Sequence, residues 1–395
     1  MPRADGNGAA AVCAAAEKAL AIAWGGTVCL GEPQALGGSD RSAVSRVRVL
    51  DGPPGAPTSV IIKRAMAAGH DTYDPDASSP GPAWRLFNDW AGLQFLSQLA
   101  DGRPPKPRFY AGDRTQGLIV VEDLGTGLRL DHLLLSKDAG AAETALMQLG
   151  TTLGQMHALT AGKEAAFDRL RDGLGPRAQR TAQEEEGLRA ALRGIAEALG
   201  VRPSSAVDRE LAALQTAIQG SSPFRTYIHG DPCPDNCLYA GATLRLLDFE
   251  FGAFGHALLD GVYGRVPFPT CWCTNRIPER IAGHMEEAYR TELVKGCAAA
   301  ADDHLFYRAV VEACAWWALK PCQWAPLPIW LEQDSDWGIA TLRQRVLGRF
   351  ALLARVTEDF GHLQALGAVA GALAVKLRDV WSLEADAMPT YPAFQ

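Results

Sequence analysis

The feature that most constrains this chain is a polar loop between apolar strands in the middle of the sequence. Residues 227–239 read Tyr-Ile-His-Gly-Asp-Pro-Cys-Pro-Asp-Asn-Cys-Leu-Tyr, and residues 246–252 read Leu-Leu-Asp-Phe-Glu-Phe-Gly. Short apolar runs bounded by Gly, Pro and Asp are typical of strands that end in tight turns. The pattern predicts a strand, a polar loop, a short strand and a second strand that ends in acids.

The polar groups of this unit match the needs of phosphoryl transfer. A carboxylate such as Asp231 can orient an acceptor hydroxyl and accept its proton. An amide and a second carboxylate, Asn236 and Asp248, can hold magnesium on nucleotide phosphates, because magnesium prefers oxygen ligands. The residues alone therefore predict a magnesium and phosphate site.

The order of these groups resembles a known family. His-Gly-Asp at 229–231, then Asn236, then Asp-Phe-Glu at 248–250 is similar to the catalytic core of the aminoglycoside phosphotransferase and choline kinase-like family, small-molecule relatives of protein kinases. The resemblance implies an α+β, two-lobed protein kinase-like fold. A small β-rich nucleotide-binding lobe is expected at residues 1–125, and a larger, mostly helical catalytic and substrate-binding lobe at 126–395.

The resemblance also implies a role for each central residue. Asp231 is expected to be the catalytic base, since the histidine at the position of His229 braces the loop in the resembled family. Asn236 and Asp248 are expected to bind magnesium. Glu250 is expected as a further or water-mediated metal contact, with a structural or surface acid as the alternative.

A glycine-containing turn in the first lobe is a candidate for covering the nucleotide phosphates. Gly38 and Ser39 lie in the polar turn at 37–42 between two apolar strands, and glycine lets backbone amides approach phosphates closely. An ordinary hairpin turn is the alternative. The segment at 70–82, rich in Asp, Ser, Gly and Pro, is expected to be a long loop.

Lys63 closes a β-branched strand at 59–62 and, in the kinase interpretation, pairs with the α- and β-phosphates. The alternative is an edge lysine that reaches solvent. Asp89, on the helical segment that follows, is expected to fix Lys63. The resembled family usually carries glutamate there, so the shorter aspartate is a departure from its pattern. The strand at 117–125 matches the hinge between the lobes, where backbone groups near Glu122 and Leu124 would meet adenine.

Several second-lobe features carry expectations of their own. His157 is expected to be a packed helix residue, and Asp260 to tie the catalytic loop down through backbone hydrogen bonds. The loop at 267–278 is expected to line the acceptor pocket, with a buried irregular core segment as the alternative. The tryptophans and acids between residues 312 and 337 are expected to form either core or a pocket. The acids of this region slightly favour a cationic acceptor.

Composition limits the partners and the compartment. A net charge of −7 argues against a nucleic-acid partner, and no apolar run reaches the roughly 20 residues of a membrane span. Glu17 and Lys18 interrupt the Ala-rich N-terminal stretch, which is therefore not expected to be a signal peptide, and a cytoplasmic location is expected. The nine cysteines are expected to be free thiols, with a zinc site at Cys233, Cys237, Cys271 and Cys273 as the minor alternative.

The family resemblance implies an ATP-dependent, magnesium-dependent kinase that transfers the γ-phosphate to a hydroxyl of a small molecule, with GTP as the alternative nucleotide. An antibiotic acceptor, and hence antibiotic resistance, is one interpretation, and a metabolic amino alcohol, sugar or amino acid is another. A non-catalytic nucleotide-binding protein also stays open, although Lys63, Asp231, Asn236 and Asp248 occur together. A metal-dependent hydrolase built on His229 is disfavoured because the site lacks further histidines.

Overall fold

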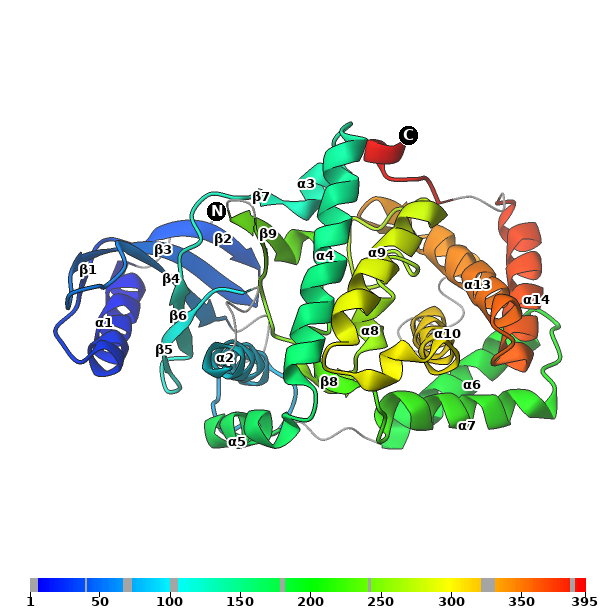
Figure 1. Ribbon diagram of the computed structural model, residues 1–395, viewed down its shortest axis with the longest axis horizontal. Coiled ribbons are helices and arrows are strands. Elements are labelled where there is room, and N and C mark those ends of the chain that lie inside the picture. The colour runs from blue at the N-terminus through cyan, green and yellow to red at the C-terminus, as the bar shows by residue number, and fades with distance from the viewer. Residues whose placement is uncertain are drawn as a thin grey trace. The chain divides into compact units, whose positions relative to one another are not determined.

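The structure is a computed structural model that describes residues 6–39, 41–66, 73–99, 106–177, 182–240, 243–320, 331–383 and 388–395. The chain forms two compact units, which Figure 1 shows with their elements labelled. The first unit combines Met1–Gly127, Lys163–Gln179 and Ala240–Ala253, and the second combines Leu128–Gly162, Arg180–Tyr239 and Phe254–Gln395. The first unit thus takes in two segments that lie beyond the boundary near residue 125 expected from the sequence.

The first unit is built on an antiparallel sheet with the strand order β1-β3-β4-β6-β5, in which β2 also pairs with β3. The strands are β1 (Cys29–Leu30), β2 (Gln34–Ser39), β3 (Ser42–Asp51), β4 (Ser59–Ala65), β5 (Phe109–Asp113) and β6 (Leu118–Glu122). Strand β4 lies between β3 and β6, and Lys63 is opposite Val44 and Ile119. Lys63 therefore lies on an interior strand, and the edge-lysine alternative is wrong.

Helices flank this sheet. Helix α1 (Gly6–Trp24) contributes Ala16 and Leu20 to a buried hydrophobic cluster that also contains Val60 and Ile62 of β4. Because side chains alternate along a strand, Lys63 points to the opposite face, where α2 (Pro82–Gln98) supplies its partner Asp89. Helix α5 (Glu164–Leu174), from the later part of the chain, packs beside α2 in the same unit.

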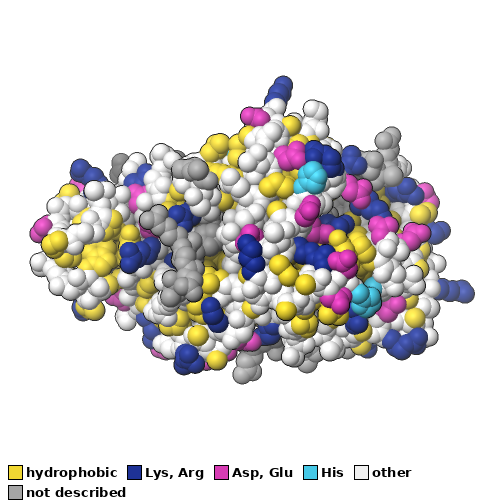
Figure 2. Space-filling model, in the orientation of Figure 1, with side chains coloured by type: hydrophobic (Ala, Val, Ile, Leu, Met, Phe, Trp, Pro, Cys, Tyr) yellow, Lys and Arg dark blue, Asp and Glu magenta, His cyan; other side chains and the backbone are white. Residues whose placement is uncertain are grey.

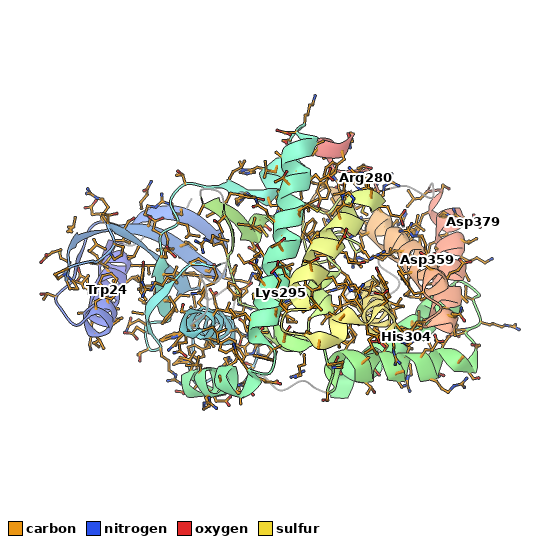
Figure 3. All side chains as sticks on the ribbon, viewed as in Figure 1. Trp24, Arg280, Lys295, His304, Asp359 and Asp379 are labelled. Carbon is orange, nitrogen blue, oxygen red and sulfur yellow. A yellow bond between two sulfur atoms is a disulfide. The ribbon has the colours of Figure 1, made fainter. Side chains whose placement is uncertain are left out.

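Aromatic packing secures the end of α1. The ring of Trp24, labelled in Figure 3, meets Tyr110 of β5 edge-on, with 5.5 Å between the centroids. Edge-to-face pairs of this kind contribute roughly 0.5–1.5 kcal/mol beyond the area that they bury.

The second unit is mostly helical. Its helices are α3 (Leu130–Leu134), α4 (Ala139–Thr160), α6 (Ala182–Ala198), α7 (Ser205–Gln219), α8 (Leu258–Gly261), α9 (Glu279–Leu293), α10 (Asp303–Leu319), α13 (Leu342–Asp359) and α14 (Gln364–Trp381). Short strands lie between these helices in the sequence: β7 (Leu128–Arg129), β8 (Arg225–Ile228), β9 (Cys237–Ala240), β11 (Ala253–His256), β12 (Asp336–Trp337) and β13 (Ala340–Thr341). Strand β10 (Thr243–Leu246) belongs to the first unit. A sheet-rich unit and a helical unit confirm the expected α+β class.

The charged side chains and the hydropathy of the helices both bear on the question of partners. Side chains of both charge signs are interspersed on the face drawn in Figure 2. Within the described ranges, no helix is both long and apolar enough to cross a membrane.

Helices α4 and α9 pack closely through two glycines. A Cβ on Gly150 would overlap the backbone carbonyl oxygen of Met285, and one on Gly154 that of Tyr289. At the outer end of the pair, Arg280 of α9, labelled in Figure 3, donates to Glu143 of α4 at 2.8 Å. The helices therefore approach each other at a distance that only glycine allows at these positions.

We predict that Gly150→Ala lowers the free energy of unfolding by about 1–3 kcal/mol, because the added methyl group overpacks a backbone contact. Gly140→Ala is the matched control on the same helix, since its Cβ would have only the Asp138 carboxylate near it, at 3.6 Å. The control should be neutral or stabilising, because alanine favours helices over glycine. Urea unfolding of both variants checks this, and equal stability would contradict the close packing.

Candidate functional site

The first unit gathers one cation and two carboxylates. Lys63 Nζ lies 2.7 Å from Asp89 Oδ2 and 2.5 Å from Asp248 Oδ1. The other oxygen of Asp89 accepts the Phe249 backbone N–H at 2.9 Å. One buried aspartate therefore links strand β4, helix α2 and the turn that follows β10, and it does so with a side chain one methylene shorter than glutamate.

Electrostatics keep Lys63 charged. Burial by itself lowers the pKa of Lys63, but the nearby charges of Asp89 and Asp248 and their hydrogen bonds outweigh burial and raise that pKa above its usual range. Burial raises the pKa of Asp89, with Lys63 opposing the shift. We take the pair as ionised, because a buried lysine cation bonded to two carboxylates is compensated by them.

Asp248 has an unusual backbone. Its φ is +64°, which lies in the left-handed region. Among residues other than glycine, mainly Asn and Asp adopt this conformation. Such conformations cost about 1–3 kcal/mol and cluster at functional sites. The turn therefore holds the Asp248 carboxylate at Lys63 at the expense of local strain.

Glu250 is engaged by arginines. Its carboxylate lies 3.2 Å from Arg41 and 3.9 Å from Arg85. Burial, then the charge of Asp248, raises the pKa of Glu250, while Lys63 and the two arginines oppose the shift. These ion pairs favour the structural alternative for this residue over a metal contact.

The glycine-containing turn is the end of the β2–β3 hairpin, where Gly38 pairs with Ala43 and Ser39 with Ser42. Gly38 has a φ of +150°, and a Cβ there would collide with the Ser42 carbonyl oxygen, so the hairpin requires glycine. Asp40 lies outside the described residues. The hairpin agrees with both the phosphate-covering and the plain-turn interpretations.

The expected hinge segment is held by an acid that sequence reasoning did not single out. Asp123, between Glu122 and Leu124, accepts from Arg46 Nε and from Ser59 Oγ, each at 2.7 Å. Burial raises the pKa of Asp123, but the hydrogen bonds lower it further, and the net shift is downward. Glu122 itself pairs with Val60 in the sheet. Charged and apolar residues alternate along β3, and this sequence pattern could have indicated the contact between Arg46 and Asp123.

In the second unit a single buried carboxylate organises the catalytic loop. Asp260 accepts the backbone N–H of His229 at 2.6 Å and that of Gly230 at 3.1 Å. The buried ring of His157 lies between Asp260, at 3.3 Å, and the hydroxyl of Tyr289, at 2.9 Å. The structural roles expected for Asp260 and His157 are confirmed.

The loop places Asp231 and Asn236 side by side. Asn236 Nδ2 donates to the Asp231 backbone carbonyl at 3.0 Å. Its amide oxygen makes no hydrogen bond with any part of the chain that the structure describes, so it can ligate a cation. Thr270 donates its hydroxyl proton to Asp231 Oδ1, and Tyr263 lies 3.1 Å from Thr270. Sequence reasoning placed the 267–278 loop near the acceptor but missed this contact.

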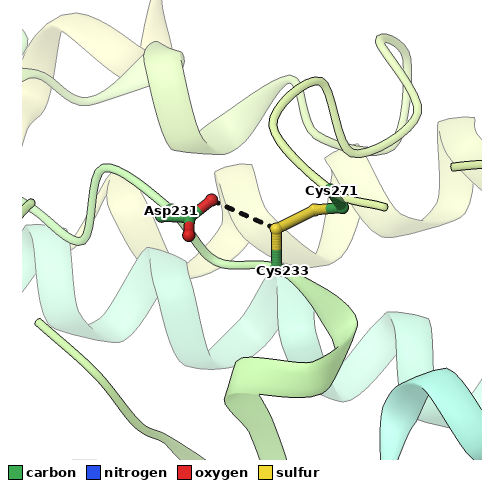
Figure 4. A group of neighbouring side chains, drawn as sticks. All are labelled: Asp231, Cys233 and Cys271. Atoms are coloured by element: carbon green, nitrogen blue, oxygen red, sulfur yellow. Dashed lines mark hydrogen bonds between the residues drawn. A yellow bond between two sulfur atoms is a disulfide. The ribbon is translucent and has the colours of Figure 1, made fainter. Parts of the chain in front are cut away.

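A disulfide joins the catalytic loop to the 267–278 loop. Cys233 and Cys271 are bonded, and Figure 4 shows them beside Asp231, whose Oδ1 lies 3.1 Å from the Cys233 sulfur. The expectation of free thiols is therefore wrong for these two residues, and their sulfurs are not available as zinc ligands. Cys237 and Cys273 stay free. The error arose because pairing depends on residues 38 positions apart.

The C-terminal tryptophans and acids divide between core and surface. Trp317 is buried and donates to the Leu259 carbonyl oxygen, whereas Trp337 is exposed. Glu312 is bonded to Arg308 and His362, and Asp334 accepts backbone N–H groups. Trp324 and Trp330 lie outside the described residues. These bonded acids weaken the sequence argument for a cationic acceptor.

We predict that Asp260→Asn destabilises the chain by roughly 2–4 kcal/mol, because the amide nitrogen of asparagine would face a backbone N–H in a buried site. Asp235→Asn is the matched control: Asp235 lies in the same loop and bonds Trp272 at the surface. Its expected loss is below about 1 kcal/mol. Chemical denaturation separates the two, and an equal loss would remove Asp260 from its organising role.

We predict that Cys233→Ser lowers stability by roughly 2–4 kcal/mol without reductant, because the bond closes a loop that spans 38 positions. Added dithiothreitol should abolish the difference from the unsubstituted chain. Cys29→Ser, at an exposed free thiol, is the control and should not respond to reductant. Alkylation of both Cys233 and Cys271 in the unreduced, denatured chain would show that the bond does not form.

Comparison with known proteins places the chain in a family. The sequence profile of the phosphotransferase enzyme family matches residues 92–290, about half of the chain. No curated protein matches it. Similar solved structures include a macrolide 2′-phosphotransferase from Brachybacterium faecium, at 16% identity and a TM-score of 0.44, covering 91% of this chain and 97% of that one.

Two further solved structures are similar at the same level. A choline kinase from Cryptosporidium parvum shows 11% identity and a TM-score of 0.43, with 89% of each chain covered. A choline/ethanolamine kinase family protein from Mesorhizobium loti shows 16% identity and a TM-score of 0.43, covering 86% of this chain and 93% of that one. The profile match, together with the two units described above, confirms the expected kinase-like fold, and the chain belongs to the phosphotransferase enzyme family as an enzyme that acts on hydroxyl groups.

Proposed function

We propose that this chain is an ATP- and magnesium-dependent kinase that transfers the γ-phosphate to a hydroxyl group of a small molecule, in the manner of aminoglycoside phosphotransferases. The observation that carries the proposal is the compensated cation at Lys63, bonded to Asp89 and Asp248. A buried lysine held by carboxylates in this way can bind phosphate oxygens once one of the two carboxylates ligates a metal ion instead.

The first unit supplies the nucleotide side of the reaction in this proposal. Lys63, fixed by Asp89, binds the α- and β-phosphates, while Gly38 and Ser39 approach the phosphates from the hairpin. Backbone groups near Glu122 and Leu124 meet the purine. ATP is the proposed nucleotide, and GTP is the alternative.

The donor set fits magnesium. Asp248 offers a carboxylate and Asn236 an amide oxygen, which are the hard ligands that this ion selects. Magnesium held by ligands of this kind would neutralise charge on the nucleotide phosphates. Glu250, engaged by arginines, is retained only as a water-mediated contact.

Asp231 is the proposed base. Its Oδ1 already accepts a hydrogen bond from the hydroxyl of Thr270, which is the kind of contact that an acceptor hydroxyl would make. The carboxylate orients the acceptor and takes its proton as the new phosphorus–oxygen bond forms and the bond to the leaving nucleoside diphosphate breaks. An aspartate of ordinary basicity suffices, because the proton leaves late in a loose transition state.

The acceptor is proposed to be a hydroxylated small molecule, either an antibiotic, which would make the chain a resistance enzyme, or a metabolic amino alcohol, sugar or amino acid. A non-catalytic nucleotide-binding role is the second candidate, and the presence of both Asp231 and Asn236 disfavours it. We also propose a cytoplasmic location, where ATP is available.

We predict that Asp231→Ala lowers acceptor-dependent turnover by at least about 10³-fold with nucleotide affinity nearly unchanged, because the acceptor loses the group that orients it and takes its proton. Asp235→Ala, four residues on in the same loop, is the control and should keep most of the turnover. The measurement is nucleoside diphosphate release with ATP or GTP and magnesium against aminoglycosides, macrolides, amino alcohols, sugars and homoserine.

A class of acceptor that stimulates release in the unsubstituted chain and in Asp235→Ala, but not in Asp231→Ala, would support the assignment. Equal turnover in the Asp231→Ala variant would remove Asp231 from the mechanism. Nucleotide binding without stimulation by any acceptor would favour the non-catalytic candidate.

A further inference from the structure

Helix α5 belongs to the first unit, although it follows α4 of the second unit in the sequence. It packs beside α2, the helix that carries Asp89, and Figure 1 shows both helices. None of the roles assigned above to the proposed nucleotide site uses a residue of α5. The helix is nonetheless joined to that site through α2.

The link is made by Arg171, a buried residue in the last turn of α5. Its Nε donates to Asn88 Oδ1 of α2 at 2.8 Å. Its Nη1 and Nη2 donate to the carbonyl oxygens of Gly175 and Pro176, at 3.0 and 3.3 Å. The guanidinium also lies over the ring of Phe87, 5.7 Å from the centroid. One side chain thus fastens the end of α5 to two consecutive residues of α2.

Asn88 transmits this restraint to the turn that follows β10. Its Nδ2 donates to the backbone carbonyl oxygen of Glu250 at 3.0 Å, while its Oδ1 accepts from Arg171. The guanidinium offers only donors and the carbonyl only an acceptor, so the amide satisfies both in a single orientation. The two bonds therefore form a relay with a fixed direction, from α5 through α2 to the backbone of the turn.

Asp89, the next residue of α2, holds the neighbouring position of the same turn. Its Oδ1 accepts the Phe249 N–H at 2.9 Å, and its Oδ2 accepts from Lys63 Nζ at 2.7 Å. Consecutive residues of α2 thus bind consecutive residues of the turn, Asp89 at Phe249 and Asn88 at Glu250. A movement of α2 would shift the partner of Lys63 and the turn together.

The buried charge of Arg171 is costly. Among the residues that the structure describes, no carboxylate is bonded to it, and its three acceptors are an amide and two carbonyl oxygens. Burial, then the charge of Arg177, lowers the pKa of Arg171 to about 10, while Asp172 opposes the shift. A buried cation stabilises less than an apolar side chain of similar size, so packing alone does not account for an arginine here. Its rigid fork of donors does orient the groups that it binds.

We propose that Arg171 is a positioning residue of the nucleotide site. Through Asn88 it holds α2 where Asp89 pairs with Lys63 and fixes the turn that bears Asp248. The effect on nucleotide affinity rests on the proposed function, whereas the restraint on the turn is a property of the chain without nucleotide. The segment that follows α4 thereby contributes to the affinity for ATP with magnesium.

Hydrogen–deuterium exchange of the full chain without nucleotide tests the restraint. In Arg171→Gln the Phe249 N–H should exchange at least about ten-fold faster, because α2 no longer holds the turn firmly. The amides of the interior strand β4 are the internal reference and should keep their exchange rates. A merely structural role of Arg171 would accelerate exchange in both places.

Arg177→Gln is the matched control. This arginine follows α5 closely, is exposed and is bonded to Asp168 and Asp172, but it does not belong to the relay. The variant should exchange at Phe249 as the unsubstituted chain does.

The relay also predicts that the effects of its two members do not add. Asn88→Ala should accelerate exchange of the Phe249 N–H, and the double variant Arg171→Gln/Asn88→Ala should exchange no faster than Asn88→Ala, because Arg171 acts through Asn88. A double variant in which the two accelerations multiply would show that the arginine acts independently of Asn88, and would overturn the relay.

Equilibrium binding of ATP with magnesium separates this inference from the proposed function. Arg171→Gln should bind ATP at least about five-fold more weakly, while the KM for the acceptor stays unchanged and Arg177→Gln binds as the unsubstituted chain does. If the unsubstituted chain binds no ATP, the proposed function fails, and faster exchange at Phe249 still supports the relay.

A further variant guards against loss of the fold. If Arg171→Gln does not fold by circular dichroism, Asn88→Asp takes its place, because a carboxylate keeps the bond from Arg171 but cannot donate to Glu250. The expected changes in exchange and in ATP affinity are the same. Unchanged exchange at Phe249, or unchanged ATP affinity in a chain that binds ATP, would overturn the inference.

Discussion

The compensation of buried charge is the constraint on which both units depend. In the first unit, Lys63 lies on the interior strand β4 and needs the carboxylates of Asp89 and Asp248. An uncompensated lysine in this position would be strongly unfavourable, so α2 and the turn at Asp248 must be brought to the sheet. The second oxygen of Asp89 then fixes the backbone of Phe249. One ion pair thus determines how three segments distant in the sequence come together.

The same principle operates in the second unit through Asp260. Its carboxylate is fully buried and is satisfied by two backbone N–H groups of the catalytic loop and by His157. The geometry of Gly230, with a φ of +79°, lets consecutive N–H groups point at one carboxylate. The proposed base, Asp231, is therefore held by backbone bonds next to it, and its own side chain accepts a hydrogen bond from the hydroxyl of Thr270.

The sequence predicted the parts of this arrangement that local motifs encode. The β-branched strand before Lys63, the acid on the following helix and the ordered residues between His229 and Glu250 all carry signals in nearby residues. What it did not predict depends on contacts between distant segments. The bond between Cys233 and Cys271 and the hydrogen bond from the Thr270 hydroxyl to Asp231 arise only once the 267–278 loop folds back. Likewise, no local pattern indicates that residues 163–179 and 240–253 join the first unit.

The most direct test of the account is the affinity of the chain for ATP with magnesium, measured for Lys63→Met and for Arg64→Gln, the neighbouring position on β4. Because side chains alternate along the strand, only Lys63 faces Asp89. The account predicts that Lys63→Met weakens binding at least about ten-fold, the loss expected for one charge-assisted contact to phosphate, while Arg64→Gln binds nearly as the unsubstituted chain does. Equal affinity in the two variants would contradict the claim that the cation at Lys63 is the nucleotide-phosphate site.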